Sequence, residues 1–170
     1  SVYLQATPQS NVLVVHPSTQ FATYTFGTVS GTETANPTIG LPINNLLISS
    51  FSQGNNANAS QTTLQISSSS VSTYAGASAQ MNVSILARKG AFHPDSSAYF
   101  EFTLNPASNY LLAIHKISFG TRSTSTGPAQ IDIRSSLDNY TSTLQNFTVN
   151  PNSNWVYLSS SFQPFVHSGA

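Results

Sequence analysis

Apolar residues recur at every second position of this chain, in short runs that glycine, proline, asparagine and serine interrupt. A period of two is the spacing of side chains on one face of a β-strand, because successive side chains point to opposite faces. The runs are rich in Val, Ile, Phe, Tyr and Thr, which suit a pleated and half-buried surface. Almost no run has helical spacing, so the sequence predicts an all-β protein.

The spacing of the runs predicts about ten short strands, arranged as an antiparallel β-sandwich that is jelly-roll-like rather than a closed barrel. Turn residues separate the runs at intervals of roughly 10–15 residues. The expected strands cover Val12–Val15, Phe21–Phe26, Leu46–Phe51, Thr63–Ser67, Met81–Ile85, Ala98–Leu104, Tyr110–Phe119, Ile131–Ile133, Phe147–Val149 and Trp155–Leu158. The segments Gly27–Asn45 and Gly54–Gln61 are poor in such patterns, and we expect loops there.

The longest expected strand changes phase along its length. Leu112 and Ile114 share one phase, whereas Ile117 and Phe119 share the other. A period of two cannot bury both sets on one face, and one extra residue would correct the phase. The sequence therefore predicts a β-bulge near His115.

The chain is long enough for one domain, and we expect a β-sandwich domain over residues 18–170 preceded by an N-terminal strand or arm over residues 1–17. The arm contains Val12, Leu13, Val14 and Val15, a run that is apolar on both faces and carries no charge. Such a strand must be buried on both sides, either in its own sandwich or in that of a neighbouring copy. The sequence leaves open a donor strand for self-association and an ordinary first strand.

Charged residues make up only 6% of the chain, against roughly a quarter in a typical soluble domain, and the formal net charge is zero. No basic stripe is present, which argues against nucleic acid as a partner. No apolar run is long enough for a membrane span. Serine, threonine and asparagine together supply more than a third of the residues, a composition that favours a secreted, extracellular or cell-surface location.

The few charges are unevenly placed, because nine of the ten lie between Arg88 and Asp138 and only Glu33 lies outside. The first 87 residues are thus almost uncharged. Strand edges and faces without charge have no electrostatic protection against pairing with another chain. We therefore expect copies of the chain itself as partners.

Residues for catalysis are scarce, so we expect no enzyme. The chain has no cysteine and no Gly-x-Ser-x-Gly motif, and its four histidines lack evident partners. Glu101, Asp132 and Asp138 could supply the paired carboxylates of a glycosidase, but a compact sandwich with short loops offers little cleft. No metal site or cofactor is predicted; calcium at Asp95 with neighbouring loop oxygens is the one ion that the residue types allow.

The segment Tyr99–Tyr140 carries the most distinctive motifs, among them Tyr99-Phe100-Glu101-Phe102 and Ile133-Arg134-Ser135-Ser136-Leu137-Asp138-Asn139-Tyr140. Together with Tyr24-Thr25-Phe26-Gly27, they resemble a β-sandwich accessory module of secreted and surface proteins of Bacteroidetes-type bacteria. The likeness covers about Phe21 to Ser160. It implies a module without established catalytic residues, for which carbohydrate binding is a common suggestion.

Outward-facing residues of this segment are the candidates for ligand binding. Tyr99 alternates with inward-facing Phe100 and Phe102, so its ring is expected to face solvent beside Glu101, where it could stack on a sugar ring. The further candidates for ligand binding are Arg122, Asp132, Arg134 and Asp138. The same residues are equally suited to forming turns and to pairing with each other across strands.

The function predicted from the sequence is a non-catalytic extracellular structural protein, such as a filament, sheath or matrix subunit, that self-associates through β-strand pairing. The alternative is a carbohydrate-binding module or adhesin domain with polysaccharide as its partner.

Overall fold

The computed structural model describes residues 22–28, 31–40, 44–57, 64–68, 81–87, 90–152 and 154–168, which form strands, turns and one 3-10 helix but no α-helix. The prediction of an all-β protein is confirmed. No helix within these ranges is long and apolar enough to cross a membrane. The 3-10 helix covers Ser136–Asp138, and the strands are β1 (Ala22–Thr23), β2 (Thr38–Ile39), β3 (Leu46–Ile48), β4 (Ser52–Gly54), β5 (Gln65–Ser68), β6 (Met81–Ser84), β7 (Tyr99–Glu101), β8 (Leu104–Pro106), β9 (Leu111–Thr121), β10 (Gln130–Ile133), β11 (Gln145–Thr148) and β12 (Val156–Ser168).

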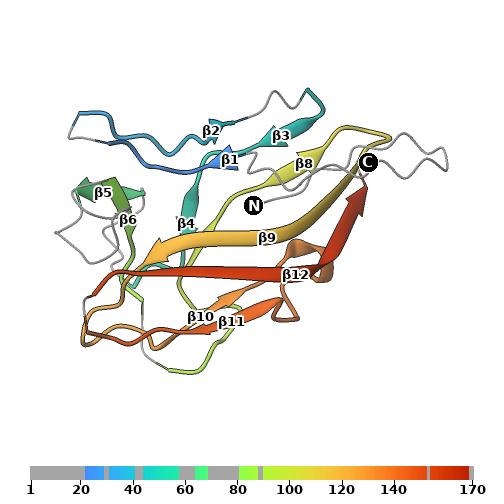
Figure 1. Cartoon of the computed structure of the whole chain (residues 1–170). Helices are drawn as coiled ribbons and strands as arrows, with labels where there is room; N and C mark the ends of the chain where they lie inside the picture. Colours follow the sequence, from blue (N-terminus) through green and yellow to red (C-terminus); the bar gives the residue numbers. More distant parts are fainter. Residues whose placement is uncertain are drawn as a thin grey trace.

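The strands form antiparallel pairs, each of which is a two-stranded sheet: β1–β2, β3–β8, β4–β7, β5–β6, β9–β12 and β10–β11. Figure 1 shows β9 and β12 as two long neighbouring ribbons through the middle of the molecule. The strand β8 contacts β9, and β11 contacts β12. The β9–β12 ribbon therefore links the β3–β8 pair on one side to the β10–β11 pair on the other.

Of the four most deeply buried apolar side chains among the described residues, three lie along this ribbon and its neighbours, and the fourth, Met81, lies on β6. Leu112 and Ile114 of β9 are 3% and 6% exposed, and Val149, just after β11, is 2% exposed. Phe119 of β9 meets Phe147 of β11 edge to face, with ring centroids 5.6 Å apart. Burial of such side chains is the main favourable term in folding, so this part of the molecule contains its core.

An irregularity interrupts the β9–β12 ladder at the position where the sequence predicts a bulge. Lys116 pairs with Ser161 and Ile114 pairs with Phe165, so only His115 stands opposite residues 162–164. The two extra residues thus belong to β12, whereas β9 runs on without an insertion. The prediction was right about the place and wrong about the strand. Residue 164 is a proline, which has no N–H to donate to a ladder.

A second irregularity divides one expected strand into β3 and β4. Ile48 pairs with Leu104 and Ser52 pairs with Glu101, so three residues of one strand stand opposite two of the other. Within this gap the Ser49 N–H donates to the Thr103 carbonyl oxygen (3.0 Å), and the Thr103 N–H donates to Ser49 Oγ (2.8 Å). Because a side-chain hydroxyl has replaced a backbone acceptor, the ladder breaks there.

The strand expected over Phe21–Phe26 is shorter than predicted, since only Ala22 and Thr23 pair with β2. Phe26 and Gly27 adopt positive φ angles of 60° and 104°, which end an extended strand. The expected loop Gly27–Asn45 contains β2. The run Val12–Val15 and the boundary between residues 17 and 18 lie outside the described residues.

Candidate functional site

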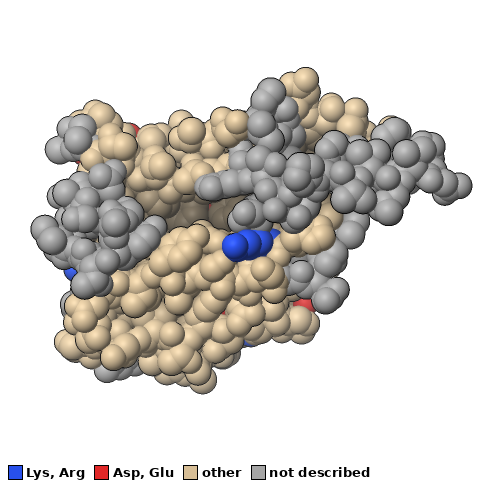
Figure 2. Space-filling view, in the orientation of Figure 1, with Lys and Arg blue, Asp and Glu red and all other residues tan. Residues whose placement is uncertain are grey.

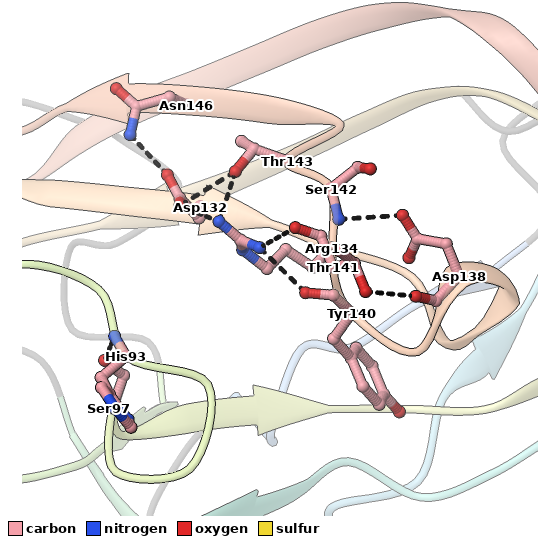
Figure 3. A network of polar contacts seen from close by, with 10 residues as sticks. All are labelled: His93, Ser97, Asp132, Arg134, Asp138, Tyr140, Thr141, Ser142, Thr143 and Asn146. Carbon is pink, nitrogen blue, oxygen red and sulfur yellow. Dashed lines mark hydrogen bonds and ion pairs between the residues drawn. The ribbon is translucent and has the colours of Figure 1, made fainter.

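Asp132 lies in β10 and Arg134 directly follows the last residue of that strand. Both of these predicted ligand-binding residues join a polar network with the turn that comes next (Figure 3). Asp132 and Arg134 are two residues apart, so their side chains share one face of the extended chain. Arg134 Nη2 lies 3.1 Å from Asp132 Oδ2, and the two side chains are only 16% and 17% exposed. The pair is therefore largely covered rather than open to solvent.

The guanidinium of Arg134 is bonded on both of its terminal nitrogens. Nη1 donates to the carbonyl oxygens of Tyr140 (2.9 Å) and Thr141 (2.8 Å). Nη2 also donates to Thr143 Oγ1 at 2.6 Å. The ring of Phe92 covers the guanidinium plane, with its centroid 3.7 Å from Arg134 Cζ. Planar guanidinium groups favour this combination of forked hydrogen bonds and aromatic stacking.

The carboxylate of Asp132 is bonded to two further side chains. Asn146, its cross-strand partner on β11, donates Nδ2–H to Oδ1, and Thr143 Oγ1 donates to Oδ2 at 3.2 Å. Burial works to raise the pKa of Asp132, but the hydrogen bonds from Asn146, Arg134 and Thr143 prevail and hold it below its ordinary value of 3.8. Asp132 is thus held as a carboxylate by its own neighbours.

Asp138 closes the turn at the far end of the same network. Its carboxylate accepts a hydrogen bond from the Ser142 N–H (2.8 Å). Hydrogen bonding from Ser142, first from its side chain and then from its N–H, lowers the pKa of Asp138. Its carbonyl oxygen accepts a bond from Thr141 Oγ1 (2.7 Å). Asn139 and Tyr140 both have positive φ angles, 57° and 58°, so the chain reverses sharply here. The structure thus brings Asp132, Arg134 and Asp138 together and engages all three in bonds within residues 132–146.

Hydrogen bonds between His93 and Ser97 close the loop that carries Phe92, and Figure 3 also shows these two residues. The His93 N–H donates to Ser97 Oγ, and the Ser97 N–H donates back to the His93 carbonyl oxygen, each at 2.9 Å. This reciprocal pair fixes the loop beside Phe92. No sequence signal pointed to the stacking of Phe92 on Arg134, because the two residues are far apart in the chain.

The other predicted ligand-binding residues lie elsewhere. Arg122 makes a different contact, with its guanidinium carbon 5.5 Å from the centroid of the Trp155 ring. Asp95, the residue considered for calcium, lies in the exposed loop between β6 and β7. Within the described part of the chain, no three His, Asp or Glu side chains gather where they could hold a metal ion.

Tyr99 and Glu101 lie on one face of β7, beside β4. Tyr99 pairs with Gly54 and Glu101 pairs with Ser52. A Cβ atom on Gly54 would lie 2.2 Å from Cζ of Tyr99, so the phenol ring lies directly against the glycine backbone. Tyr99 is 43% exposed, and Glu101 accepts a hydrogen bond from Ser52 Oγ (3.3 Å). The outward placement predicted for Tyr99 is confirmed; its partner Gly54 was expected to begin a loop.

The opposite face of β7 carries an aromatic cluster, which we define as Tyr24, Phe26, Phe51, Phe100 and Phe102. Phe51 lies at its centre, with ring centroids 5.1–5.5 Å from Phe26, Tyr24 and Phe100 and 6.1 Å from Phe102. Phe100 and Phe102 are nevertheless 38% and 37% exposed. The alternation predicts that both rings face the interior. They do pack against Phe51, but they are more exposed than predicted, because the cluster reaches the surface.

Tyr24 anchors the aromatic cluster to the break between β3 and β4. Its hydroxyl donates to the Ser49 carbonyl oxygen at 2.7 Å, and its ring centroid lies 5.2 Å from that of Phe102. Burial raises the pKa of Tyr24 to about 12, because the charged phenolate is poorly solvated there. The sequence placed Tyr24 and Phe26 on one strand face but gave no sign of their meeting with Phe51.

Comparison with protein-family models, curated proteins and solved structures finds no match to this chain. The resemblance to a bacterial surface module, drawn from the motifs, stays a prediction. The self-association residues Val12, Leu13, Val14 and Val15 lie outside the described residues, so their role also stays a prediction. Among the described residues, the aromatic cluster and the Tyr99 face are exposed features available for contact with another molecule.

Proposed function

We propose that this chain is a non-catalytic, extracellular structural protein that self-associates, and that the aromatic cluster is part of the surface through which copies meet. The single observation that carries the proposal is the exposure of Phe100 and Phe102, more than a third each, within a group of five contacting rings. Contiguous apolar surface of this kind marks sites of association, since its removal from water is favourable.

The distribution of charge supports the proposal. Figure 2 shows a face on which Lys, Arg, Asp and Glu side chains occupy only scattered spots. Asp132 and Arg134 neutralise each other within their own network. Glu101 is adjacent in sequence to both Phe100 and Phe102, but it bonds to Ser52 on the other face of β7. Electrostatic repulsion between two copies that meet at the aromatic cluster is therefore weak.

The arrangement of the strands is compatible with association by strand pairing. In the part of the chain that the structure describes, each strand is hydrogen-bonded to one other strand. Strand edges that present free N–H and C=O groups can accept an added strand. In this proposal the run Val12–Val15 of one copy adds to such an edge in the next copy, and Pro17 ends the added strand.

We also propose that the strand pairs are arranged as a β-sandwich of jelly-roll type. The contacts of β8 with β9 and of β11 with β12 place further strand pairs beside the central ribbon, as two packed layers require. The Phe119–Phe147 contact joins strands of two different pairs through their side chains, which is how layers of a sandwich pack. Residues 18–170 would form this domain, and residues 1–17 would form the arm.

The test compares assembly of four forms by size-exclusion chromatography with light scattering over a range of protein concentrations. The double variant Phe100→Lys/Phe102→Lys and a chain lacking residues 1–17 should both shift to smaller species than the wild type. Leu137→Lys, which adds one positive charge at an exposed apolar residue outside the cluster, should assemble like the wild type. Unchanged assembly of the double variant, provided that it keeps the wild-type far-UV spectrum, would contradict a role for the aromatic cluster.

A further inference from the structure

We propose that Tyr99, Gly54 and Glu101 form a binding platform for a neutral pyranose ring of a polysaccharide. This inference goes beyond self-association, and it concerns the face of β7 opposite the aromatic cluster. The three residues come from the paired strands β4 and β7. Their arrangement offers the two features that sugar rings require, which are a flat aromatic surface and hydrogen-bonding groups beside it.

The absence of a side chain at Gly54 gives the platform its shape. A Cβ atom there would lie 2.2 Å from both Cζ and Oη of Tyr99 and 2.6 Å from Cε1. The far end of the phenol ring therefore rests on the backbone of β4 instead of standing up from the sheet. One side of the ring is covered by the glycine, and the 43% exposure of Tyr99 leaves the other side open to solvent. An aromatic ring that crosses a cross-strand glycine in this way is also held in place by it.

The open ring suits the apolar side of a sugar. The π-face of an aromatic ring carries partial negative charge, and the C–H groups on one side of a pyranose carry partial positive charge. A sugar that stacks on Tyr99 would direct its hydroxyl groups outward along the sheet. It would lose little solvation there, because a stacked ring covers only one of its sides.

Glu101 supplies acceptors for those hydroxyl groups. It lies two residues from Tyr99 on the same side of the strand, a separation of about 7 Å along the backbone. The distance from the middle of a stacked sugar ring to a hydroxyl oxygen and the length of a hydrogen bond from that hydroxyl together nearly cover this separation. Ser52 Oγ bonds one of its oxygens at 3.3 Å, and a carboxylate can accept several hydrogen bonds in all. A carboxylate at this place disfavours anionic ligands, so the platform fits neutral polysaccharides better than acidic ones.

The experiment uses the full chain and three defined neutral probes, cellohexaose, laminarihexaose and maltohexaose, with binding measured by isothermal titration calorimetry. At least one probe should bind the wild type. Tyr99→Ala should weaken that binding by about tenfold, as expected for the loss of a stacked aromatic contact, whereas Tyr99→Phe should keep it within about twofold. Tyr157→Ala, at another exposed tyrosine, should bind like the wild type.

Gly54→Ala tests the geometry without removing the ring. Gly54 has no left-handed φ, so its backbone accepts alanine, but the new methyl group must displace Tyr99. This variant should lose binding about as strongly as Tyr99→Ala while melting at a similar temperature. Both variants should assemble like the wild type in light scattering, which separates this inference from the proposed self-association.

Three results would overturn the platform. The first is a wild type that binds none of the probes. The second is a Tyr99→Ala or Gly54→Ala variant that binds as tightly as the wild type. The third is a wild type that binds hexalysine in preference to the sugars and releases it at high salt, because the site would then be a cation site built on Glu101.

Discussion

At the scale of single residues, Arg134 contacts more of its neighbours than we expect of a side chain that faces solvent. Its two terminal nitrogens bond to Tyr140, Thr141, Thr143 and Asp132, and Phe92 stacks on it. Four of these partners lie within ten residues of Arg134, so the side chain fixes the fold of its own turn. Both charges are largely covered, and the loss of one would leave the other without its partner.

Replacement of Arg134 by lysine should therefore destabilise the protein although the charge is kept. An ammonium group cannot reach two carbonyl oxygens and two side chains in the same plane, so the free energy of unfolding should fall by about 2 kcal/mol. Urea unfolding measures the change. Arg122→Lys, at an exposed arginine that contacts Trp155, should cost less than about 1 kcal/mol. Equal losses in the two variants would contradict the role given to Arg134.

The sequence indicated which residues of this network matter but not what they bind. The alternation of residues 131–134 placed Asp132 and Arg134 on one face, and the hydrogen bond between their side chains agrees with this. Their partners depend on the positive φ angles of Asn139 and Tyr140, which turn two carbonyl oxygens toward Arg134. A left-handed φ at a tyrosine is uncommon and has no sequence signal, so the turn could not be predicted.

The phenol of Tyr24 should lose its proton at a higher pH than the phenol of an ordinary tyrosine. Its folded-state pKa of about 12 lies above the ordinary value of 10.0, so the neutral phenol stabilises the fold below pH 10 and this contribution is lost as the pH rises through about 12. The difference in phenolate absorbance between wild type and Tyr24→Phe isolates this group. Titration of the difference near pH 10 would contradict the burial described for Tyr24.

At the scale of elements, the strands follow the alternating pattern wherever the backbone has no special requirement. The expected strands at Ile131–Ile133 and Phe147–Val149 overlap β10 and β11, and these two form one pair. The breaks between β3 and β4 and within β12 depend on one or two extra residues and on a serine hydroxyl that replaces a backbone acceptor. The hydrophobic pattern does not show which of two paired strands holds an extra residue, so the bulge was assigned to β9 instead of β12.

The turn after β1 gives a test at this scale. Gly27 has a φ of 104°, and a Cβ atom there would lie 2.4 Å from the Thr32 carbonyl oxygen. Gly27→Ala should lower the free energy of unfolding by about 2 kcal/mol or more, from backbone strain and the collision together. Gly31 has a φ of 92° but open space around it, so Gly31→Ala carries the strain alone and should cost about 1 kcal/mol. Thermal unfolding measures the loss of stability in the two variants. Equal losses would show that the structure relaxes around the new contact with Thr32.

At the scale of the whole molecule, scarcity of charge is the property that the sequence shows most directly. Ten charged side chains in 170 residues leave most of the surface to serine, threonine, asparagine and apolar groups. The structure adds two features that composition could not supply. The aromatic cluster reaches solvent on one face of β7, and the Tyr99 platform lies on the other face. The first is suited to contact with another copy, and the second to contact with a sugar.

Sedimentation velocity of the unmodified chain at neutral pH tests self-association most directly. The boundary should move faster as the protein concentration rises, because exposed aromatic surface without compensating charge favours association. Moderate salt should not slow it, since the association does not depend on ion pairs. A single slow boundary of monomer size at every concentration would contradict the central proposal.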